Sequence, residues 1–410
     1  MAEVSPFKGV RYNPDIAGSL GSLISPPYDV ISESQLRQLT ERSPFNFTRL
    51  ILSYKLNTQG DQGFQDAADN LRAWMQDGVL LQDANPAIYR TTIQYSLHEV
   101  EKTFHGIIAL VRLHPYEDRV VLPHEKTLKG PKENLIRLMN HTRANLDSIW
   151  MLYEDNQAEV KNVLLNAEWK NLFPPTDDGQ GTRYSLEMCD QPEITEAFRK
   201  AMESQQLTIA DGHHRYETAL EYARQNGSEN PSCQWVLATL TWTDDPGLTV
   251  LPTHRSVRGL DESLISSLPS EMSKLFPMEK IGTGNLQAEL EALAEPGFVL
   301  RTRSEAWRVA AGSEEGGIGA EPVQNRILST ILGFDIANLK TDPRIAYMED
   351  MELASRAVDN GEFQAAFLLK PVQVRCITRY ASQMKTMPQK STYFYPKLAS
   401  GLVFRLLEEG

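Results

Sequence analysis

The chain has 410 residues, of which 41% are hydrophobic, and its formal net charge is -13. This length and apolar content suffice for a sizeable core and for two closely packed lobes, which excludes a disordered chain. The acidic balance disfavours nucleic acid as the main partner, because binding to phosphate backbones needs a basic surface. No apolar run approaches the roughly 20 residues of a membrane-spanning helix, and the N-terminal residues lack a signal-peptide pattern. We therefore expect a cytoplasmic protein without a membrane or nucleic-acid partner.

Cysteine usage gives no sign of a metal or disulfide framework. Cys189, Cys233 and Cys376 are widely separated and form no Cys-x-x-Cys pair. A structural zinc cluster is therefore not expected, and buried thiols are the simplest interpretation.

The N-terminal part predicts helices, a hairpin and a buried strand. Pro26 and Pro27 force an extended backbone, after which Ser32 has the character of a helix N-cap. Further along, apolar side chains recur at helical spacing or alternate as in strands. The resulting predictions are helices over residues 67–75 and 134–145, a hairpin of strands over 87–95 and 103–113, and a strand over 149–153.

The breaker-rich segment 173–181 is the candidate boundary between an N-terminal lobe, residues 1–172, and a C-terminal lobe, residues 183–410. The second lobe would begin with a β-loop-α-β unit. The predicted fold class is α+β, with mixed sheets and flanking helices. The elements expected here are strands over 207–210, 235–241 and 298–300, helices over 216–225, 286–293 and 323–332, and a glycine-rich loop over 312–319.

Residues 210–216 hold the strongest chemical motif. They lie between a short apolar strand and a helix, and the backbone N–H groups of a helix N-terminus attract anions. Gly212 permits close approach of the backbone, Arg215 can hold two phosphate oxygens, and Asp211 can ligate Mg²⁺ or orient a histidine. Phosphate binding is the functional interpretation. The alternative is that Asp211 caps the helix while the adjacent histidines fill a polar seam.

A second cluster lies in the loop after the predicted hairpin. Glu125 stands between His124 and Lys126, and a carboxylate beside such neighbours can have a pKa suited to proton transfer. Glu125 is the candidate general base, with Asp29 and Asp211 as rivals. A solvated charged turn is the alternative.

Three weaker clusters complete the candidates. His254 and Arg255 would approach the phosphate loop if the strands over 207–210 and 235–241 were neighbours, and otherwise lie in a surface turn. Lysines and hydroxyls in residues 387–397 would close over a phosphorylated ligand, although their aromatic neighbours also suit a core. The carboxylate and phenol of residues 26–29 belong either to a site or to a structural turn.

Five motifs, in this order, resemble the bacterial and archaeal domain-of-unknown-function family one thousand and fifteen over essentially the whole chain. They are PPYDV at residues 26–30, HEKT at 124–127, ADGHHRYETA at 210–219, LPTHR at 251–255 and MPQKSTYFYPKL at 387–398. More distantly, the DGHHR segment resembles the ParB and sulfiredoxin superfamily, in which a short loop at a helix N-terminus binds nucleotide phosphates. That superfamily includes free-serine kinases.

These resemblances imply a ParB/sulfiredoxin-like element around the DGHHR loop and a kinase of a small hydroxylated metabolite, most specifically L-serine. ATP, ADP or pyrophosphate would be the donor, with Mg²⁺ as charge partner. Catalytic roles would fall to Glu125, His124, Asp211 and His214, with Asp211 also a metal ligand. The remaining candidates are Gly212, His213, Arg215, His254, Arg255, Lys390, Ser391, Thr392 and Lys397 for the phosphate or nucleotide, and Tyr28, Asp29, Lys126 and Thr127 for the acceptor.

Two alternatives stay open. The same loop could bind phosphate in a nucleotide-sensing module without turnover. A metal-dependent hydrolase would use His124, His213, His214 and His254, although these histidines lack a recognised ligand spacing. The sequence has no Walker A motif and no protein-kinase motifs, which disfavours the standard nucleotide-binding folds.

Overall fold

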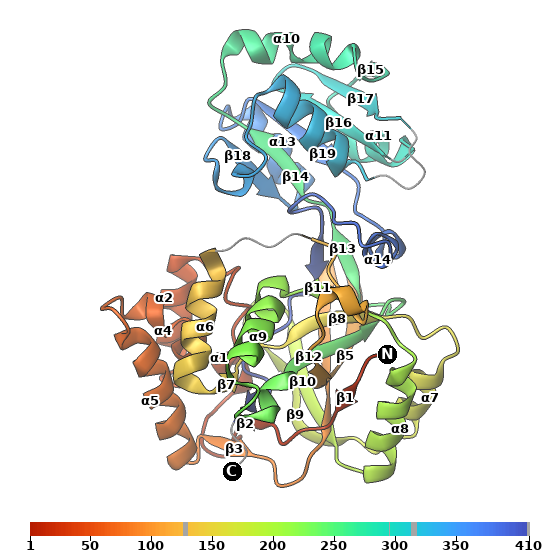
Figure 1. Ribbon diagram of the computed structural model, residues 1–410. Helices are drawn as coiled ribbons and strands as arrows, with labels where there is room; N and C mark the ends of the chain where they lie inside the picture. Colours follow the sequence, from red (N-terminus) through yellow and green to blue (C-terminus); the bar gives the residue numbers. More distant parts are fainter. Residues whose placement is uncertain (126–129, 295, 313–317, 408–410) are drawn as a thin grey trace. The chain divides into compact units, whose positions relative to one another are not determined.

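The computed structural model describes residues 1–125, 130–294, 296–312 and 318–407, and combines α and β structure as expected (Figure 1). The chain forms two compact units. Unit 1 comprises Met1–Thr249 and Pro396–Gly410, and unit 2 comprises Val250–Tyr395. Within the described residues, no helix has both the length and the apolar character needed to cross a bilayer.

The expected lobe boundary at residues 173–181 is wrong. β9 (Lys170–Asp177) and β10 (Arg183–Cys189) form an antiparallel hairpin there, inside the sheet of unit 1. Gly179 and Gly181 take positive φ angles of 82° and 87° in the turn, which is why the segment is rich in glycine. The breakers therefore mark a hairpin turn.

Unit 1 is built on a nine-stranded sheet. The predicted hairpin is confirmed as its antiparallel β4–β5 pair. β1 (Val4–Ser5) pairs with β5 beside the main path. In spatial order the strands of that path are β6 (Val121–Leu122), β11 (Leu207–Asp211), β8 (Ile149–Tyr153), β12 (Trp235–Trp242), β5 (Val100–Arg112), β4 (Ile88–Leu97), β10 and β9.

The two strands of the predicted β-loop-α-β unit do not pair with each other. β11 and β12 both pair with β8, antiparallel and parallel respectively, so they are not neighbours. The helix between them is α9 (His213–Asn226), which starts three residues earlier than predicted because Gly212 itself occupies the N-cap position. The strand β8, which comes earlier in the chain, thus lies between β11 and β12.

One face of the central strands forms the main core. Ile149 and Met151 of β8 point to this face, together with Phe198 of α8 (Pro192–Glu203) and Tyr216 and Ala219 of α9. Because side chains alternate along a strand, Trp150 points to the opposite face, where its ring meets Phe104 edge-on. The strands are buried on both sides, which explains their nearly continuous apolar sequences.

The remaining elements of unit 1 surround this sheet. Ser32 caps α2 as predicted, with a reciprocal capping box to Gln35. α6 ends earlier than expected, because Arg143 has a φ of 48° and the next two residues pair as β7. The helices are α1 (Leu20–Leu23), α2 (Glu33–Arg42), α3 (Thr48–Ile51), α4 (Ser53–Leu56), α5 (Gln62–Gln76), α6 (Gly130–Thr142), α7 (Glu159–Leu165) and α8 (Pro192–Glu203), and the small strand pairs are β2 (Val10–Tyr12) with β3 (Leu80–Gln82) and β7 (Ala144–Asn145) with β21 (Arg405–Leu406).

Unit 2 has its own antiparallel sheet and core. Val299 and Leu368 pack with α11 and α13 on one face, whereas Phe298 and Phe367 point to the other. The predicted helix over 323–332 is a π-helical segment, Val323–Ile331. The expected glycine-rich loop lies largely outside the described residues. The sheet order is β15 (Met278–Ile281), β17 (Ala306–Ala310), β16 (Gly297–Thr302), β19 (Ala365–Leu369), β14 (His254–Val257) and β18 (Ile345–Met348); β13 (Thr249–Leu251) pairs with β20 (Tyr393–Tyr395), and the helices are α10 (Glu262–Ser273), α11 (Leu286–Ala292), α12 (Ala320–Pro322), α13 (Met351–Asp359) and α14 (Val374–Ser382).

Candidate active site

The candidate site is built where β11 meets α9. Gly212 has a φ of 94°, and its N–H donates to Oδ1 of Asp211 over 2.8 Å. A Cβ atom at position 212 would lie 2.9 Å from Nε of Arg215. Only glycine therefore fits both the backbone conformation and the space. The helix begins at once, and the N–H groups of its first turn have no acceptor within the helix.

The guanidinium of Arg215 folds back over this glycine. Its Nη1 donates to the carbonyl oxygen of Ser148, which precedes β8, over 2.5 Å. Burial lowers the pKa of Arg215, but nearby carboxylates, that of Asp147 foremost, raise it above the ordinary value. The loop thus holds a permanent positive charge in a fixed position.

Asp211 pairs with a lysine from the far end of the chain. Nζ of Lys397 lies 3.0 Å from Oδ2 of Asp211, and both residues belong to unit 1. Burial would raise the pKa of Asp211, but Lys397 and then Arg215 hold it well below its usual range. The carboxylate is therefore ionised and lies between two cations. The structure brings the predicted Lys397 to the DGHHR loop.

Two histidines fix the neighbouring loop. Nδ1 of His124 donates to the carbonyl oxygen of Ile209 over 2.7 Å, and the N–H of His124 donates to Nε2 of His213 over 3.3 Å. The rings meet edge-on, with centroids 4.7 Å apart. Burial lowers the pKa of both residues, that of His124 to about 4, so the pair is neutral at pH 7. His214, the next residue along α9, is half-buried.

Glu125 follows His124 in the segment after β6, which ends at Leu122. β6 runs parallel to β11, with Leu122 opposite Thr208, so the loop after β6 and the loop after β11 leave the same edge of the sheet. Glu125 is half-buried. Its predicted companions Lys126 and Thr127 lie outside the described residues.

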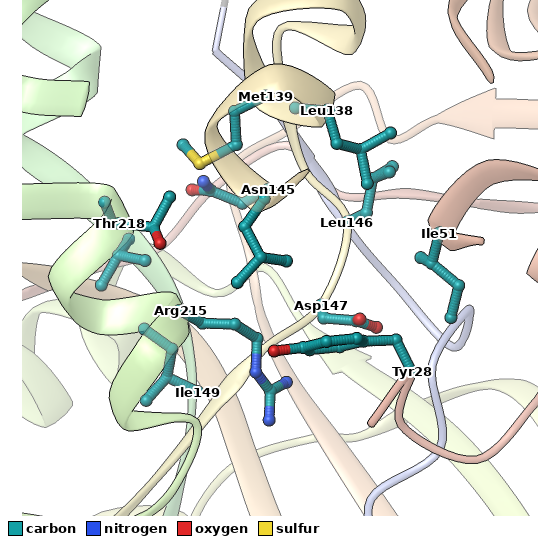
Figure 2. A pocket seen from close by; sticks show the side chains of 14 residues that line it. Tyr28, Ile51, Leu138, Met139, Asn145, Leu146, Asp147, Ile149, Arg215 and Thr218 are labelled. Carbon is teal, nitrogen blue, oxygen red and sulfur yellow. The ribbon is translucent and has the colours of Figure 1, made fainter. Parts of the chain in front are cut away.

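A cavity of about 50 Å³ opens beside Arg215. Figure 2 shows the hydroxyl end of Tyr28 turned toward the side chain of Arg215, and the side chain of Asp147 beside the Tyr28 ring. Asn145 and Asp147 were not predicted. They lie in a short segment between α6 and β8, where apolar and polar residues alternate over residues 144–147. Asp29, next to Tyr28, is exposed, although its charge acts on Arg215.

The remaining predicted residues lie in unit 2. Arg255 is fully buried in β14, and its Nη2 lies 3.4 Å from the carbonyl oxygens of Gln389 and Lys390. Nδ1 of His254 accepts from the N–H of Leu369 over 3.0 Å. The expectation of a surface turn at residues 254 and 255 is therefore wrong, because both residues lie in a central strand.

The segment that contains Lys390 forms a tight turn. Lys390 has a positive φ of 58°, and the hydroxyl of Ser391 donates to the carbonyl oxygen of Pro388 over 2.6 Å. Arg255 contacts this turn, so two of the predicted clusters, residues 254–255 and residues 388–391, meet within unit 2. The proximity argument for residues 254 and 255 also fails, because β11 and β12 are not neighbours. Phosphate-binding roles for His254, Arg255, Lys390, Ser391 and Thr392 stay predictions.

Residues 4–328 match a family described as "Protein of unknown function (DUF1015)". No curated protein matches the sequence. Among solved structures, a conserved hypothetical protein from Pyrococcus furiosus shares 14% identity at a TM-score of 0.40, covering 73% of this chain and 95% of that one. A free serine kinase in complex with AMP shares 14% identity at a TM-score of 0.40, covering 72% and 91%. SbnI from Staphylococcus aureus, truncated at its C-terminus, shares 10% identity at a TM-score of 0.36, and the match covers 71% of this chain and 85% of that one.

Proposed function

We propose that this chain, which belongs to the DUF1015 family, is a phosphotransferase that acts on a small hydroxylated metabolite. One observation carries the proposal: the N-terminus of α9, the guanidinium of Arg215 and the ammonium of Lys397 converge on the end of β11 around Asp211. Helix N-termini and fixed cations are the groups that bind phosphate and stabilise the charge of a transferring phosphoryl group.

These groups are held before any ligand arrives. Arg215 is fixed by Ser148, and Lys397 is fixed by Asp211. A phosphate at the helix N-terminus would meet the first-turn N–H groups without a large rearrangement. Such preorganisation gives electrostatic catalysis its effect, because the donors need not reorient as charge develops.

Glu125 is the proposed base. His124, the residue before Glu125, is buried and donates to the carbonyl oxygen of Ile209. This contact fixes the backbone from which Glu125 projects. In the reaction, Glu125 would accept the proton of the acceptor hydroxyl while the hydroxyl oxygen forms a bond to the terminal phosphorus. The bond from that phosphorus to the bridging oxygen breaks, and the shortened donor leaves with the electron pair.

The finer assignments belong to the same proposal. L-serine is the favoured acceptor, because the DGHHR segment is similar to the phosphate loop of a superfamily that includes free-serine kinases. ATP, ADP or pyrophosphate is the donor. Mg²⁺ would come with the donor phosphates, and Asp211 offers one carboxylate toward it, which suits a cation that keeps most of its waters. Both oxygens of Asp211 already accept hydrogen bonds, so the protein would provide few ligands.

The metal-dependent hydrolase is less well supported. Nδ1 of His124 and Nε2 of His213 are engaged with backbone groups, and His254 belongs to the other unit. In the part of the chain that the structure describes, no group of three histidine, cysteine or acidic side chains suits a metal ion.

The test is a phosphate-transfer screen of the purified protein, pairing ATP, ADP and pyrophosphate with L-serine and other small alcohols. We expect Glu125→Gln to slow transfer by roughly 10²-fold or more and Arg215→Met by roughly 10³-fold. Glu221→Gln and Arg224→Met, on the exposed part of α9, are matched controls that should retain the wild-type rate. Nucleotide binding through Arg215 without turnover would refute the enzyme and favour the sensing module.

A further inference from the structure

The groups that would bind a phosphate at the loop are engaged with an anion of the protein itself, the carboxylate of Asp211. Its Oδ1 accepts from the N–H of Gly212 over 2.8 Å, and its Oδ2 accepts from Nζ of Lys397 over 3.0 Å. Because α9 begins two residues later, the carboxylate also lies beside a helix N-terminus, where a negative charge is stabilised. The side chain of Asp211 therefore has the surroundings of a bound anion.

Both cations beside Asp211 are opposed by carboxylates. Burial lowers the pKa of Arg215, whereas the carboxylates of Asp147 and then Asp211 raise it. The side chains of Lys397 and Asp211 are 18% and 21% exposed, so solvent and salt screen this pair only in part. An arriving phosphate thus meets negative charge as well as positive charge at the loop.

Contact between a phosphate and Lys397 requires an exchange of partners. The lysine ammonium is carried on a flexible stem and can turn from the carboxylate to the phosphate. The carboxylate of Asp211 then loses a charged hydrogen bond while a second negative charge comes close to it. Both effects oppose the binding of the phosphate.

We propose that Asp211 is an internal competitor of phosphate: its carboxylate occupies the anion-binding position at the N-terminus of α9, and phosphate binding transfers Lys397 from Asp211 to the ligand. The inference rests on the proposed function, because it concerns the regulation of the same site. The contact keeps Lys397 at the loop and at the same time limits how tightly a phosphate is held.

Calorimetric titration with pyrophosphate, in the presence of a chelator of divalent cations, tests the competition. We expect Asp211→Asn to bind pyrophosphate roughly 10- to 100-fold more tightly than the wild type, the range of one charged hydrogen bond. A structural role of Asp211 in shaping the loop predicts the opposite sign. Equal or weaker binding by the variant would overturn the proposal.

A double-mutant cycle separates competition from a positioning role. Lys397→Met should reduce the affinity for pyrophosphate less in the wild type than in Asp211→Asn, because only in the variant does the lysine bind the ligand without leaving a carboxylate. The reverse order would show that Asp211 merely holds Lys397 in place, and would contradict the competition. Asp190→Asn removes the carboxylate of another lysine pair, that with Lys170, and should bind pyrophosphate as the wild type does.

One measurement needs no variant. In a crystal structure of the wild-type protein with pyrophosphate, Nζ of Lys397 should contact the ligand and lie beyond hydrogen-bond distance of Oδ2 of Asp211. A Lys397–Asp211 pair that stays intact beside bound pyrophosphate would overturn the exchange.

Failure of this inference is distinguishable from failure of the proposed function. Phosphate transfer by the wild type, together with weaker binding of pyrophosphate by Asp211→Asn, would reject the competition and keep the kinase. Tighter binding by Asp211→Asn, with no transfer from any donor, would reject the kinase and keep a regulated anion site.

Discussion

Replacement of Gly212 by alanine tests the geometry of the loop. A left-handed backbone costs an L-residue about 1–2 kcal/mol, partly offset by the lower entropy of the unfolded chain. The new Cβ would also lie 2.9 Å from Nε and 3.1 Å from Cζ of Arg215, so the guanidinium must move. That movement breaks the 2.5 Å bond to Ser148, a charged hydrogen bond worth roughly 1.5–3 kcal/mol. We therefore expect Gly212→Ala to lower the free energy of unfolding by roughly 2–4 kcal/mol.

Gly179→Ala is the matched control. Gly179 has a similar φ of 82°, and no heavy atom lies within 4 Å of a Cβ there, so only the backbone terms apply and roughly 1 kcal/mol should be lost. Urea denaturation followed by circular dichroism would measure both variants, and titration with pyrophosphate would measure anion binding. Equal destabilisation of the two variants, with unchanged affinity for pyrophosphate, would refute the coupling between Gly212 and Arg215.

Three further predictions concern stability. Burial lowers the pKa of His124 from 6.5 to about 4, so between these pH values a proton binds at this residue in the unfolded chain but not in the folded one. The free energy of unfolding should therefore fall by roughly 3 kcal/mol as the pH drops from 6.5 to 4. Urea titrations of His124→Asn should show a smaller dependence on pH, and an unchanged dependence would contradict the role of His124. Tyr89→Phe removes the buried hydroxyl that bonds to Gly9, Asp83 and, over 3.5 Å, Phe7, whereas Tyr12→Phe removes a single bond to Phe45. Thermal denaturation should therefore show the larger loss for Tyr89, and the reverse order would be inconsistent with these contacts. Asp359→Ala removes the carboxylate beside the buried Arg301 and should lower the free energy of unfolding by about 1–3 kcal/mol. Glu352→Ala breaks the exposed pair with Arg356 and should lower it by less than about 0.5 kcal/mol. Equal urea midpoints of the two variants would contradict this difference.

The sequence predicted those elements whose signals are local. The strands over 149–153 and 235–241 were recognisable because buried strands are continuously apolar, and Ser32 because a capping box lies within four residues. The DGHHR loop was recognisable because glycine, arginine and two histidines adjoin one another. These features need no knowledge of the rest of the chain.

Other features depend on contacts between distant residues. The position of β8 between β11 and β12 decides which clusters meet, and no local pattern encodes strand order. Asp147 acquires its importance only from the proximity of Tyr28 and Arg215, which are remote in sequence. Arg255 is buried in spite of its charge, and its charge was the reason for considering a surface turn as the alternative.

The interrupted course of unit 1 has a consequence for the order of synthesis. A ribosome delivers Asp211 and Arg215 early, but Lys397 and strand β21 only after all of unit 2, because residues 250–395 come between. Until then the nascent loop has an ionisable carboxylate without its lysine, and β7 has no strand to pair with. Any chain that ends before Pro396 would contain the whole of α9 and still lack Lys397, one of the two cations beside Asp211. The pairing of Asp211 with Lys397 and of β7 with β21 therefore follows the synthesis of unit 2.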